Sequence, residues 1–390
     1  MTQPASPEPG SGPGPGPGPG PDSEFRPHRD GRDPGEISRR LGRWLAGQSP
    51  GATPLDVALP GADPGGNGVS SDTVPVCVDW PSGPADYVVR MAPLPGDVPV
   101  FRTYNLPHQH ETMRLVRELT DVPVPQVRWL EPTGEVLGRP FFVMDAVSGV
   151  VPPDMLPYNL GDSWLFDASP AQQRRLQEAS VAVLAELHKI PDAAGSFGFL
   201  LPDFPGDTPL LRHLAWTRDW YRYAAGDLAP APLVEKALDW LDAHCPPQEE
   251  DPVLCWGDAR IGNILYQDFT PAGVLDWEMA ALGPRQLDLA WMFFSHRVFE
   301  ELAANFALPG MPGFLREDDV VALYEELTGC RVGDLTWYRL YAAVQWAVVF
   351  LRVGTSQIRF GEKDMPGETE ELILHRGLLE RLVAETGVIR

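Results

Sequence analysis

The sequence predicts an α+β protein of two unequal parts, a small strand-rich part followed by a larger and mostly helical one. Three observations support this. Strand-like segments at residues 74–78, 86–90 and 140–145 all come early, and they enclose one helical stretch. After residue 149 helical spacing of apolar residues dominates. The 43% hydrophobic content of the 390 residues is enough for a sizeable core.

The first 34 residues are set apart by a proline and glycine tract that contains an unbroken GPGPGPGPGP run. Such a segment cannot bury apolar surface, so we expect residues 1–34 to form a disordered tail. The strand-rich part is then predicted over residues 35–148 and the helical part over residues 149–390.

The spacing of apolar residues indicates the type of each further element. In the first part it predicts helices over residues 36–48 and 108–119. In the second part it predicts two short strands and six helices: strands 253–256 and 273–276, and helices 172–190, 233–241, 287–297, 317–327, 336–353 and 368–386.

The charge balance excludes one class of partner. With 31 Lys and Arg against 54 Asp and Glu, the formal net charge is −23. General nucleic-acid binding depends on basic residues that neutralise phosphates, so we expect no nucleic-acid partner. The balance leaves open a cationic substrate, or an anion held by a local arginine cluster. Lysine is scarce, since only Lys189, Lys236 and Lys363 occur.

Cysteine usage and hydropathy indicate the compartment. The four cysteines lie far apart and form no CxxC pair, which favours reduced thiols over a zinc site or a disulfide framework. No signal peptide pattern opens the chain. The longest apolar stretch, residues 340–353, is too short to span a bilayer. We therefore expect a soluble cytoplasmic protein with no membrane partner. The sequence leaves its oligomeric state open.

The most informative segment reads W-G-D-A-R-I-G-N over residues 256–263, followed by L-D-W-E-M-A over residues 275–280. Asp258 and Asn263 are five positions apart on a loop, and Asp276 ends the next strand. Phosphoryl transfer needs one carboxylate to accept the proton of a hydroxyl, and an amide oxygen and a second carboxylate to hold Mg²⁺. The D-x4-N spacing is that of the protein-kinase catalytic loop.

Together with G-P-R-Q-L-D-L-A-W over residues 283–291, these motifs resemble the aminoglycoside phosphotransferase family, and most closely its W-G-D-A-R-x-G-N branch. The resemblance covers about residues 36–385. It implies a protein-kinase-like fold with a small β-rich N-lobe and a larger, mostly helical C-lobe. It also implies an ATP-dependent, Mg²⁺-requiring kinase that phosphorylates a hydroxyl of a small molecule.

The resemblance assigns roles to individual positions. Asp258 takes the place of the catalytic base, and Arg260 lies where protein kinases carry a phosphate-contacting lysine. Asn263 and Asp276 take the places of the Mg²⁺ ligands. Asp288 matches a position that orients the catalytic loop through hydrogen bonds. At residue 256 many relatives have histidine where this chain has tryptophan, so the role of that position is left open.

The first part supplies the nucleotide-binding half in this interpretation. A glycine-rich segment resembles the kinase loop whose backbone covers the phosphates. Its candidate residues are Gly66, Gly68, Ser70 and Ser71. A P-loop is excluded because the chain contains no Gly-Lys dipeptide. Met144 matches the gatekeeper position, and the backbone of Asp145 and Val147 is expected to receive the adenine edge.

The scarcity of lysine has a consequence for the phosphate clamp. No lysine precedes residue 189, so the usual lysine of the first lobe is absent. Arg90, at the end of a predicted strand, occupies its place. Arginine offers a fixed planar fork where lysine offers a point charge, so the two residues are not interchangeable. Glu111, near the start of the next helix, is the expected ion-pair partner of Arg90.

Two alternatives remain open at this stage. The absent lysine also suits a non-catalytic, nucleotide-binding pseudokinase module. Among acceptors, the acidic balance suits a polycationic aminoglycoside-like antibiotic, whereas several arginines could line an anion site for a hydroxyacyl-CoA or another hydroxylated metabolite. These arginines are Arg102, Arg212, Arg218 and Arg222. The acceptor pocket is expected near residues 200–230, which carry a tryptophan and tyrosine cluster.

Overall fold

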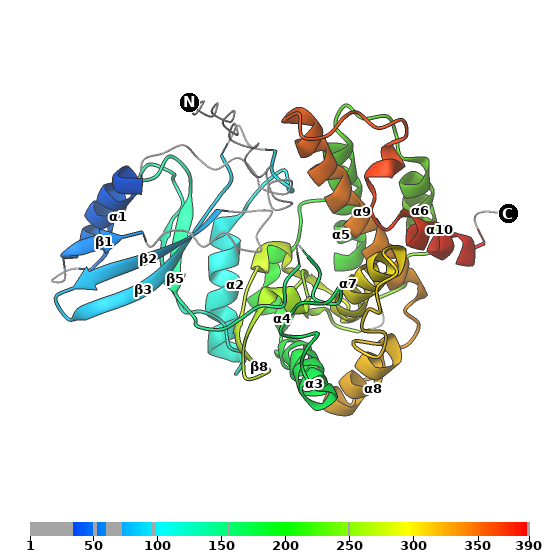
Figure 1. Cartoon of the computed structure of the whole chain (residues 1–390), viewed down its shortest axis with the longest axis horizontal. Helices are drawn as coiled ribbons and strands as arrows, with labels where there is room; N and C mark the ends of the chain where they lie inside the picture. The colour runs from blue at the N-terminus through cyan, green and yellow to red at the C-terminus, as the bar shows by residue number, and fades with distance from the viewer. Residues whose placement is uncertain are drawn as a thin grey trace, which may run out of the picture.

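A computed structural model of the chain describes residues 34–49, 53–59, 72–94, 98–154, 156–248 and 250–387. A five-stranded antiparallel sheet forms the N-lobe, and helices make up most of the C-lobe (Figure 1). The expected two-lobed, kinase-like α+β fold is confirmed. The predicted tail, residues 1–34, lies outside the described residues except for its last position.

The N-lobe sheet has the strand order β1-β2-β3-β5-β4. Its strands are β1 (Asp56–Ala58), β2 (Asp72–Trp80), β3 (Gly83–Met91), β4 (Val127–Glu131) and β5 (Phe141–Asp145). The helix α1 (Pro34–Gln48) packs on the β1 end of the sheet, and α2 (Leu106–Leu119) packs against β4 and β5. In Figure 1, α2 stands between the sheet and the helical lobe.

Side chains alternate between the two faces of the sheet, as the pleat of a β-strand requires. On β5, Phe141 and Val143 pack with α1 in one apolar cluster, whereas Phe142 and Met144 belong to the core that continues into the helical lobe. On β3, Val89 points to the α1 side. Arg90, the next residue along, therefore faces the other lobe.

The C-lobe is built around two long buried helices, α7 and α9, which pack against each other. Its α-helices are α3 (Pro170–Leu187), α4 (Ala193–Ser196), α5 (Pro209–Ala225), α6 (Pro232–Ala243), α7 (Gln286–Asn305), α8 (Glu317–Thr328), α9 (Thr336–Arg359) and α10 (Arg376–Glu385). Two small antiparallel sheets accompany them: β6 (Val253–Cys255) with β9 (Ala281–Gly283), and β7 (Ile264–Gln267) with β8 (Thr270–Val274).

Most predicted elements are present, with differences at their ends and in one helix. The helix expected over residues 368–386 is two pieces, the short turn η5 (Thr369–Leu372) and α10. Between them lies His375, which is buried and has its Nε2 2.9 Å from the carbonyl oxygen of Ala343. The strands β1 and β4 are not among the predicted elements.

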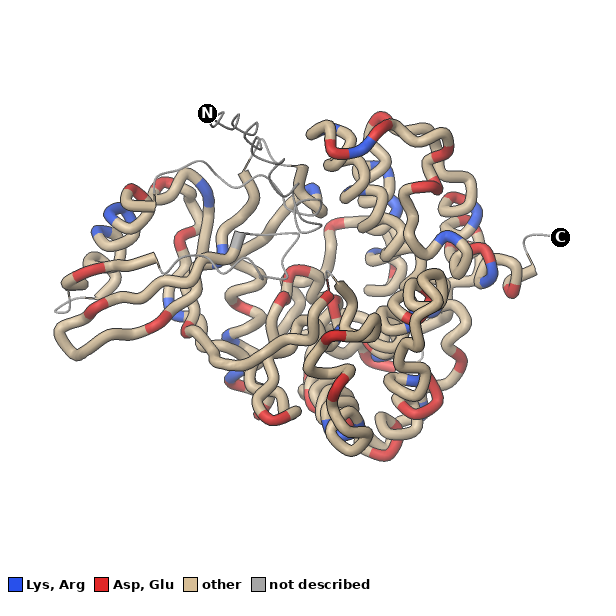
Figure 2. The backbone as a smooth tube through the Cα atoms, viewed as in Figure 1, with Lys and Arg blue, Asp and Glu red and all other residues tan. Residues whose placement is uncertain are grey.

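Acidic and basic residues are spread over both lobes, with acidic positions the more numerous (Figure 2). Among the described residues, no helix combines the length and the apolar character that crossing a membrane would require. All four cysteines are free thiols.

Two buried histidines make the stability of the fold depend on pH. Burial lowers the pKa of His213 and of His375 to about 4. Since this lies below the unfolded value of about 6.5, each histidine contributes stability that is fully present above pH 6.5 and is lost as the pH falls toward 4. We expect the free energy of unfolding to fall by about 2 kcal/mol per histidine between pH 7 and pH 5.

Urea unfolding of the wild type and of His213→Gln at both pH values measures this effect. His213 hydrogen-bonds through Nδ1 to the hydroxyl of Tyr341, at 2.6 Å, and glutamine keeps a polar group there without titrating. The variant should lose less stability between pH 7 and pH 5 than the wild type. Equal losses in the two proteins would show that His213 does not contribute.

Candidate active site

The predicted catalytic loop leaves β6 at the centre of the molecule. Residues 256–260 follow this strand, and the turn η3 (Ile261–Asn263) leads into β7. Gly257 has φ +88°, and a Cβ atom there would lie 2.0 Å from the carbonyl oxygen of Met279. Only glycine therefore fits at this position. The close approach brings the loop against the segment that follows β8, which carries Asp276.

Asp288, at the start of α7, holds the loop through hydrogen bonds to its backbone. Its two carboxylate oxygens accept the backbone N–H groups of Trp256, at 2.7 Å, and Gly257, at 2.8 Å. The Nε2 atom of His188 lies 3.1 Å from the same carboxylate, and its Nδ1 lies 2.8 Å from the hydroxyl of Tyr324. Asp288 is fully buried. The structure thus gives Asp288 the kind of contacts that the resemblance implies.

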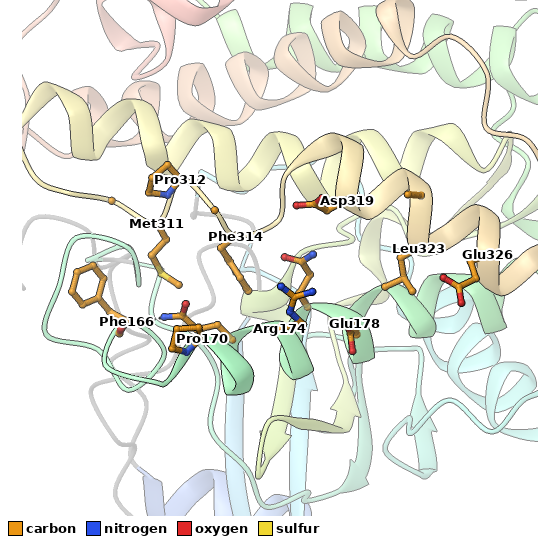
Figure 3. Close-up of a pocket in the computed structure, with 15 residues that line it drawn as sticks. Phe166, Pro170, Arg174, Glu178, Met311, Pro312, Phe314, Asp319, Leu323 and Glu326 are labelled. Atoms are coloured by element: carbon orange, nitrogen blue, oxygen red, sulfur yellow. Dashed lines mark hydrogen bonds between the residues drawn. The ribbon is translucent and has the colours of Figure 1, made fainter.

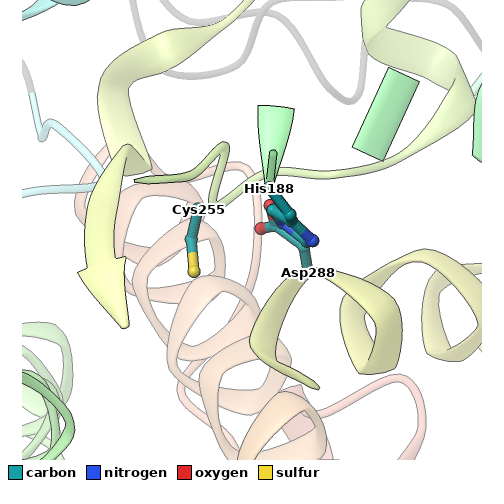
Figure 4. Close-up of side chains that lie close together, drawn as sticks. All are labelled: His188, Cys255 and Asp288. Carbon is teal, nitrogen blue, oxygen red and sulfur yellow. The ribbon is translucent and has the colours of Figure 1, made fainter. Parts of the chain in front are cut away.

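His188, Cys255 and Asp288 lie close enough to resemble a metal centre (Figure 4). Their donor atoms are already used, however. Both ring nitrogens of His188 and both carboxylate oxygens of Asp288 are hydrogen-bonded, and burial raises the pKa of the Cys255 thiol well above its usual value. A metal binds thiolate rather than thiol. The cluster is therefore an anchor for the catalytic loop.

Asp258 is held by three side chains. Trp291 Nε1 donates to Oδ1 at 2.7 Å, Asn263 Nδ2 donates to Oδ2 at 2.7 Å, and Arg260 Nε lies 3.1 Å from both oxygens. The side chain of Asp258 is 15% exposed. A carboxylate fixed in this way has one orientation, as proton transfer from a positioned hydroxyl requires. Trp291 is a site residue that the motif did not identify as such.

Asn263 and Asp276 offer the oxygen atoms that Mg²⁺ prefers. The amide nitrogen of Asn263 donates to Asp258, so the amide oxygen of Asn263 remains available to a metal ion. Arg90 takes one carboxylate oxygen of Asp276 at 2.6 Å, and the described residues donate no hydrogen bond to the other. The segments of the two residues are joined directly, because Leu275 N–H donates to the carbonyl of Asn263 at 2.9 Å. This donor set fits a hard divalent cation.

Arg90 extends from β3 of the N-lobe toward Asp276 and is buried, with 8% of the residue exposed. Its Nη2 contacts Asp276 at 2.6 Å and Glu278 at 2.9 Å, and its Nε donates to Gln109 at 3.0 Å. Burial alone would lower the pKa of Arg90, but the two carboxylates outweigh burial and raise it. Arg90 therefore joins the N-lobe sheet to the segment that carries Asp276.

The expected ion pair between Arg90 and Glu111 is wrong. Glu111 faces outward and pairs with Arg114 on the same helix, at 2.6 Å. Gln109, two positions earlier, lies on the opposite face of α2 with Leu106 and Met113. The helical spacing in the sequence contains this signal, since only Gln109 falls on the apolar face.

The remaining nucleotide residues differ in how the structure places them. Met144 is buried in β5, as a gatekeeper would be. The amide of Asp145 donates to the carbonyl of Gln126 at 2.9 Å, so any contact of its backbone with a nucleotide would come from its carbonyl. Val147 is half-buried in the segment after β5. The glycine-rich segment with Gly66, Gly68, Ser70 and Ser71 lies outside the described residues.

Comparison with known proteins supplies the family. The model of the phosphotransferase enzyme family (APH) matches residues 66–324, more than half of the chain. The chain belongs to the phosphotransferase enzyme family. This confirms the family resemblance expected from the sequence.

Solved structures of other phosphotransferases share the fold. A candidate aminoglycoside phosphotransferase of Ralstonia eutropha is 21% identical with a TM-score of 0.63, covering 89% of this chain and 97% of that one. A thermostable variant of aminoglycoside phosphotransferase APH(4)-Ia, in complex with ADP and hygromycin B, is 14% identical with a TM-score of 0.51, covering 88% and 98%. At these identities the likeness concerns the fold alone.

The curated relatives of this phosphotransferase are longer proteins. Acyl-CoA dehydrogenase family member 10 of Mus musculus is 28% identical over 227 residues, which are 56% of this chain and 19% of that protein. Human acyl-CoA dehydrogenase family member 11 is 27% identical over 213 residues, 52% of this chain and 24% of that protein. The chain thus corresponds to about a quarter or less of either relative.

Trp256, which replaces the histidine of many family members, is packed inside this phosphotransferase. Its side chain is fully buried, and Nε1 donates to the carbonyl of Leu275 at 2.8 Å. Its ring lies 6.1 Å from that of Trp277. Trp256 therefore ties the catalytic loop to the segment that carries Asp276, which a buried aromatic residue with one N–H donor can do.

A cavity of about 670 Å³ lies between α3, α8 and the segment 310–314 (Figure 3). Arg174, Glu178 and Asp319 contribute charged groups to its wall, and Phe166 and Phe314 contribute apolar surface. None of the residues that line it belongs to the candidate active site. The cavity is therefore separate from the candidate active site.

Arg90, which replaces the usual phosphate-binding lysine of the first lobe, gives a first test of the site. Lysine at position 90 keeps the charge but cannot contact Gln109, Asp276 and Glu278 together. Losing one charge-assisted hydrogen bond of about 1.5 kcal/mol corresponds to about a tenfold change. We expect Arg90→Lys to raise the KM for Mg·ATP by about tenfold, measured from ADP release.

Arg114→Lys is the matched control for that substitution. Arg114 is another arginine in a carboxylate pair, but it lies on the exposed face of α2, with 40% of its side chain accessible. This control should bind Mg·ATP as the wild type does. An Arg90→Lys protein with the KM of the wild type would show that the arginine fork has no part in nucleotide binding.

Proposed function

We propose that this phosphotransferase uses Asp258 as its catalytic base. The acceptor hydroxyl donates its proton to the Asp258 carboxylate while its oxygen forms a bond to the γ-phosphorus of ATP. The bond between that phosphorus and the bridging oxygen breaks, and the electron pair leaves with ADP. The observation that supports this most strongly is the fixed orientation of Asp258, which accepts hydrogen bonds from Trp291, Asn263 and Arg260.

The other site residues bind and orient in this proposal. Asn263 and Asp276 would hold Mg²⁺, which neutralises charge on the nucleotide phosphates when it is bound. Arg260 lies beside Asp258 and is suited to contact the transferred phosphoryl group. Arg90 faces the phosphates from the N-lobe, and Met144, Asp145 and Val147 line the adenine side. The same proposal divides the chain into an N-lobe over residues 35–148 and a C-lobe over residues 149–390. The boundary lies shortly after the end of β5.

A hydroxylated, positively charged small molecule is the acceptor that the local charges favour. The site holds four carboxylates, the base Asp258 together with Asp154, Asp276 and Glu278, and among the described residues only two guanidinium groups contact them, those of Arg90 and Arg260. An excess of negative charge attracts a cationic acceptor. Hygromycin B, in the complex with the related fold, is an aminoglycoside-type acceptor of the class we propose.

A hydroxyacyl-CoA is the second candidate, supported by a different observation. Two guanidinium groups lie over the ring of Tyr223, that of Arg352 at 4.1 Å and that of Arg102 at 5.0 Å. Arg352 is 8% exposed, and within the described residues it makes no ion pair with Asp or Glu. A cation of this kind suits an anionic group. The names of the longer relatives also point toward acyl-CoA chemistry.

The other residues of the expected acceptor region have structural contacts. Trp220 and Tyr221 are buried in α5, and Trp220 Nε1 donates to the carbonyl of Val100 at 2.8 Å. Arg218 is paired with Asp239 and Asp242. These groups favour packing of α5 over contact with an acceptor.

Nucleotide binding and acceptor choice can be tested in two steps. Mg·ATP should raise the melting temperature, and ATP with EDTA should raise it less. ADP release should then increase when a matching acceptor is added from a panel of aminoglycosides and hydroxyacyl-CoA thioesters. An absence of any shift with millimolar Mg·ATP would contradict the proposal. A shift without any ADP release would favour a non-catalytic nucleotide-binding module.

A further inference from the structure

Asp154 reaches the catalytic loop from a segment that carries none of the family motifs. It lies between β5 and α3, 106 positions before Arg260 in the sequence, and its side chain is 14% exposed. Its Oδ2 accepts a hydrogen bond from Nη1 of Arg260. Arg260 is itself 17% exposed, so the pair is largely shielded from water.

The carboxylate of Asp154 also fits against the backbone of the loop. A Cβ atom at Gly262 would lie 2.3 Å from Oδ2 of Asp154 and 2.5 Å from its Oδ1. No other residue at position 262 leaves room for this carboxylate without a shift of the loop or of Asp154. The loop therefore has a glycine at the point where the acidic side chain approaches it.

The contacts of Arg260 divide between two carboxylates. Its Nε lies 3.1 Å from both oxygens of Asp258, and its Nη1 donates to Asp154. Within the described residues, Nη2 has no hydrogen-bond acceptor. Two contacts on different nitrogens fix the plane of a guanidinium group, whereas one contact would let it rotate. The fixed plane leaves Nη2 as the donor for an incoming anionic group.

The second carboxylate oxygen of Asp154, Oδ1, lowers the stability of the folded state. Oδ1 is buried and has no hydrogen-bond partner in the part of the chain that the structure describes. A buried carboxylate oxygen without a partner costs free energy. Burial raises the pKa of Asp154, and Arg260 opposes that shift. Arg260 thus stabilises the buried carboxylate of Asp154, and Asp154 in turn orients the guanidinium group of Arg260.

We propose that Asp154 is a positioning residue that holds Arg260 between two carboxylates, with its third nitrogen directed to the transferred phosphoryl group. The inference rests on the proposed function of Asp258 and Arg260. Asp154 itself touches neither nucleotide nor acceptor in this proposal. Its effect on phosphoryl transfer is exerted entirely through Arg260, so removing it matters only while Arg260 is present.

A double-mutant cycle on ATP turnover tests this dependence. Misplacing a catalytic group by about 1 Å can cost about 100-fold in rate, so Asp154→Ala should lower kcat by about 10- to 100-fold and change the KM for Mg·ATP by less than about threefold. Asp154→Asn, which keeps an acceptor oxygen, should lose less. In the Arg260→Ala background, adding Asp154→Ala should change kcat by no more than about twofold. Additive losses would overturn the proposal.

The same four proteins without nucleotide give an independent readout. Arg260→Ala leaves the carboxylates of Asp154 and Asp258 close together without their shared cation, so its melting temperature should fall. Adding Asp154→Ala should restore part of that loss. If the second substitution lowers the melting temperature further, Asp154 is not paired with Arg260 and the proposal fails.

Arg174→Ala, on the wall of the separate cavity, serves as the control and should leave both readouts unchanged. The failure of the proposed function can be distinguished from the failure of this inference. A wild type that binds no Mg·ATP would contradict the proposed function, while the melting temperatures would still decide the pairing. An active wild type whose kcat is unaffected by Asp154→Ala would contradict the inference alone.

Discussion

Asp258→Asn is expected to lower kcat for phosphoryl transfer by about 10³-fold, within the range that general base catalysis contributes. An amide cannot take up the proton of the acceptor hydroxyl. It also offers only one oxygen, whereas the carboxylate accepts from Trp291 at Oδ1 and from Asn263 at Oδ2. Binding of Mg·ATP should change much less than kcat. Steady-state ADP release and the nucleotide-induced rise in melting temperature measure the two effects separately.

Asp251→Asn provides the matched control, because Asp251 is an exposed carboxylate shortly before β6. This protein should release ADP at the rate of the wild type. If Asp258→Asn retains more than about a tenth of the wild-type kcat, the proton is accepted elsewhere, since a general base contributes at least about 100-fold.

Asp276→Asn is expected to lower turnover at fixed Mg²⁺ by about 100-fold or more, because a bound metal ion supplies several kcal/mol of charge stabilisation. Its carboxylate is the only negatively charged group among the two proposed metal ligands. Asparagine keeps one oxygen but offers no charge. The Mg²⁺ concentration that gives half-maximal turnover should therefore rise, and a titration of ADP release with Mg²⁺ measures this directly.

Glu278→Gln separates the role of Asp276 as a ligand from its role as a partner of Arg90. Both carboxylates contact Arg90 Nη2, at 2.6 Å and 2.9 Å, but only Asp276 is a proposed metal ligand. The control should leave the Mg²⁺ requirement near that of the wild type. Equal shifts in the Mg²⁺ requirement for the two variants would mean that the charge around Arg90, rather than ligation, determines it.

The sequence predicts the local parts of this site well. The W-G-D-A-R-I-G-N segment puts Asp258, Arg260 and Asn263 on one loop, and the structure brings their side chains together. Short-range spacing is enough here because η3 folds the segment back on itself.

Contacts between distant segments were harder to predict. The position of Glu111 near the start of the next helix predicts a pair with Arg90, but α2 turns Gln109 toward Arg90 instead. Asp154 carries no motif, and only the folded chain brings it to Arg260. In both cases the outcome depends on which face a segment presents after packing. One-dimensional spacing defines a face on a helix, yet it does not define the neighbour that the face meets.

The fate of radioactive phosphate from γ-³²P-labelled ATP tests the central claim most directly. The wild-type protein, incubated with Mg²⁺ and a panel of aminoglycosides and hydroxyacyl-CoA thioesters, should transfer label to at least one acceptor as a phosphate ester. The label should not appear with Asp258→Asn or in the presence of EDTA. A wild-type protein that binds Mg·ATP but neither releases ADP nor labels any acceptor would contradict the assignment of Asp258 as the base of a small-molecule kinase.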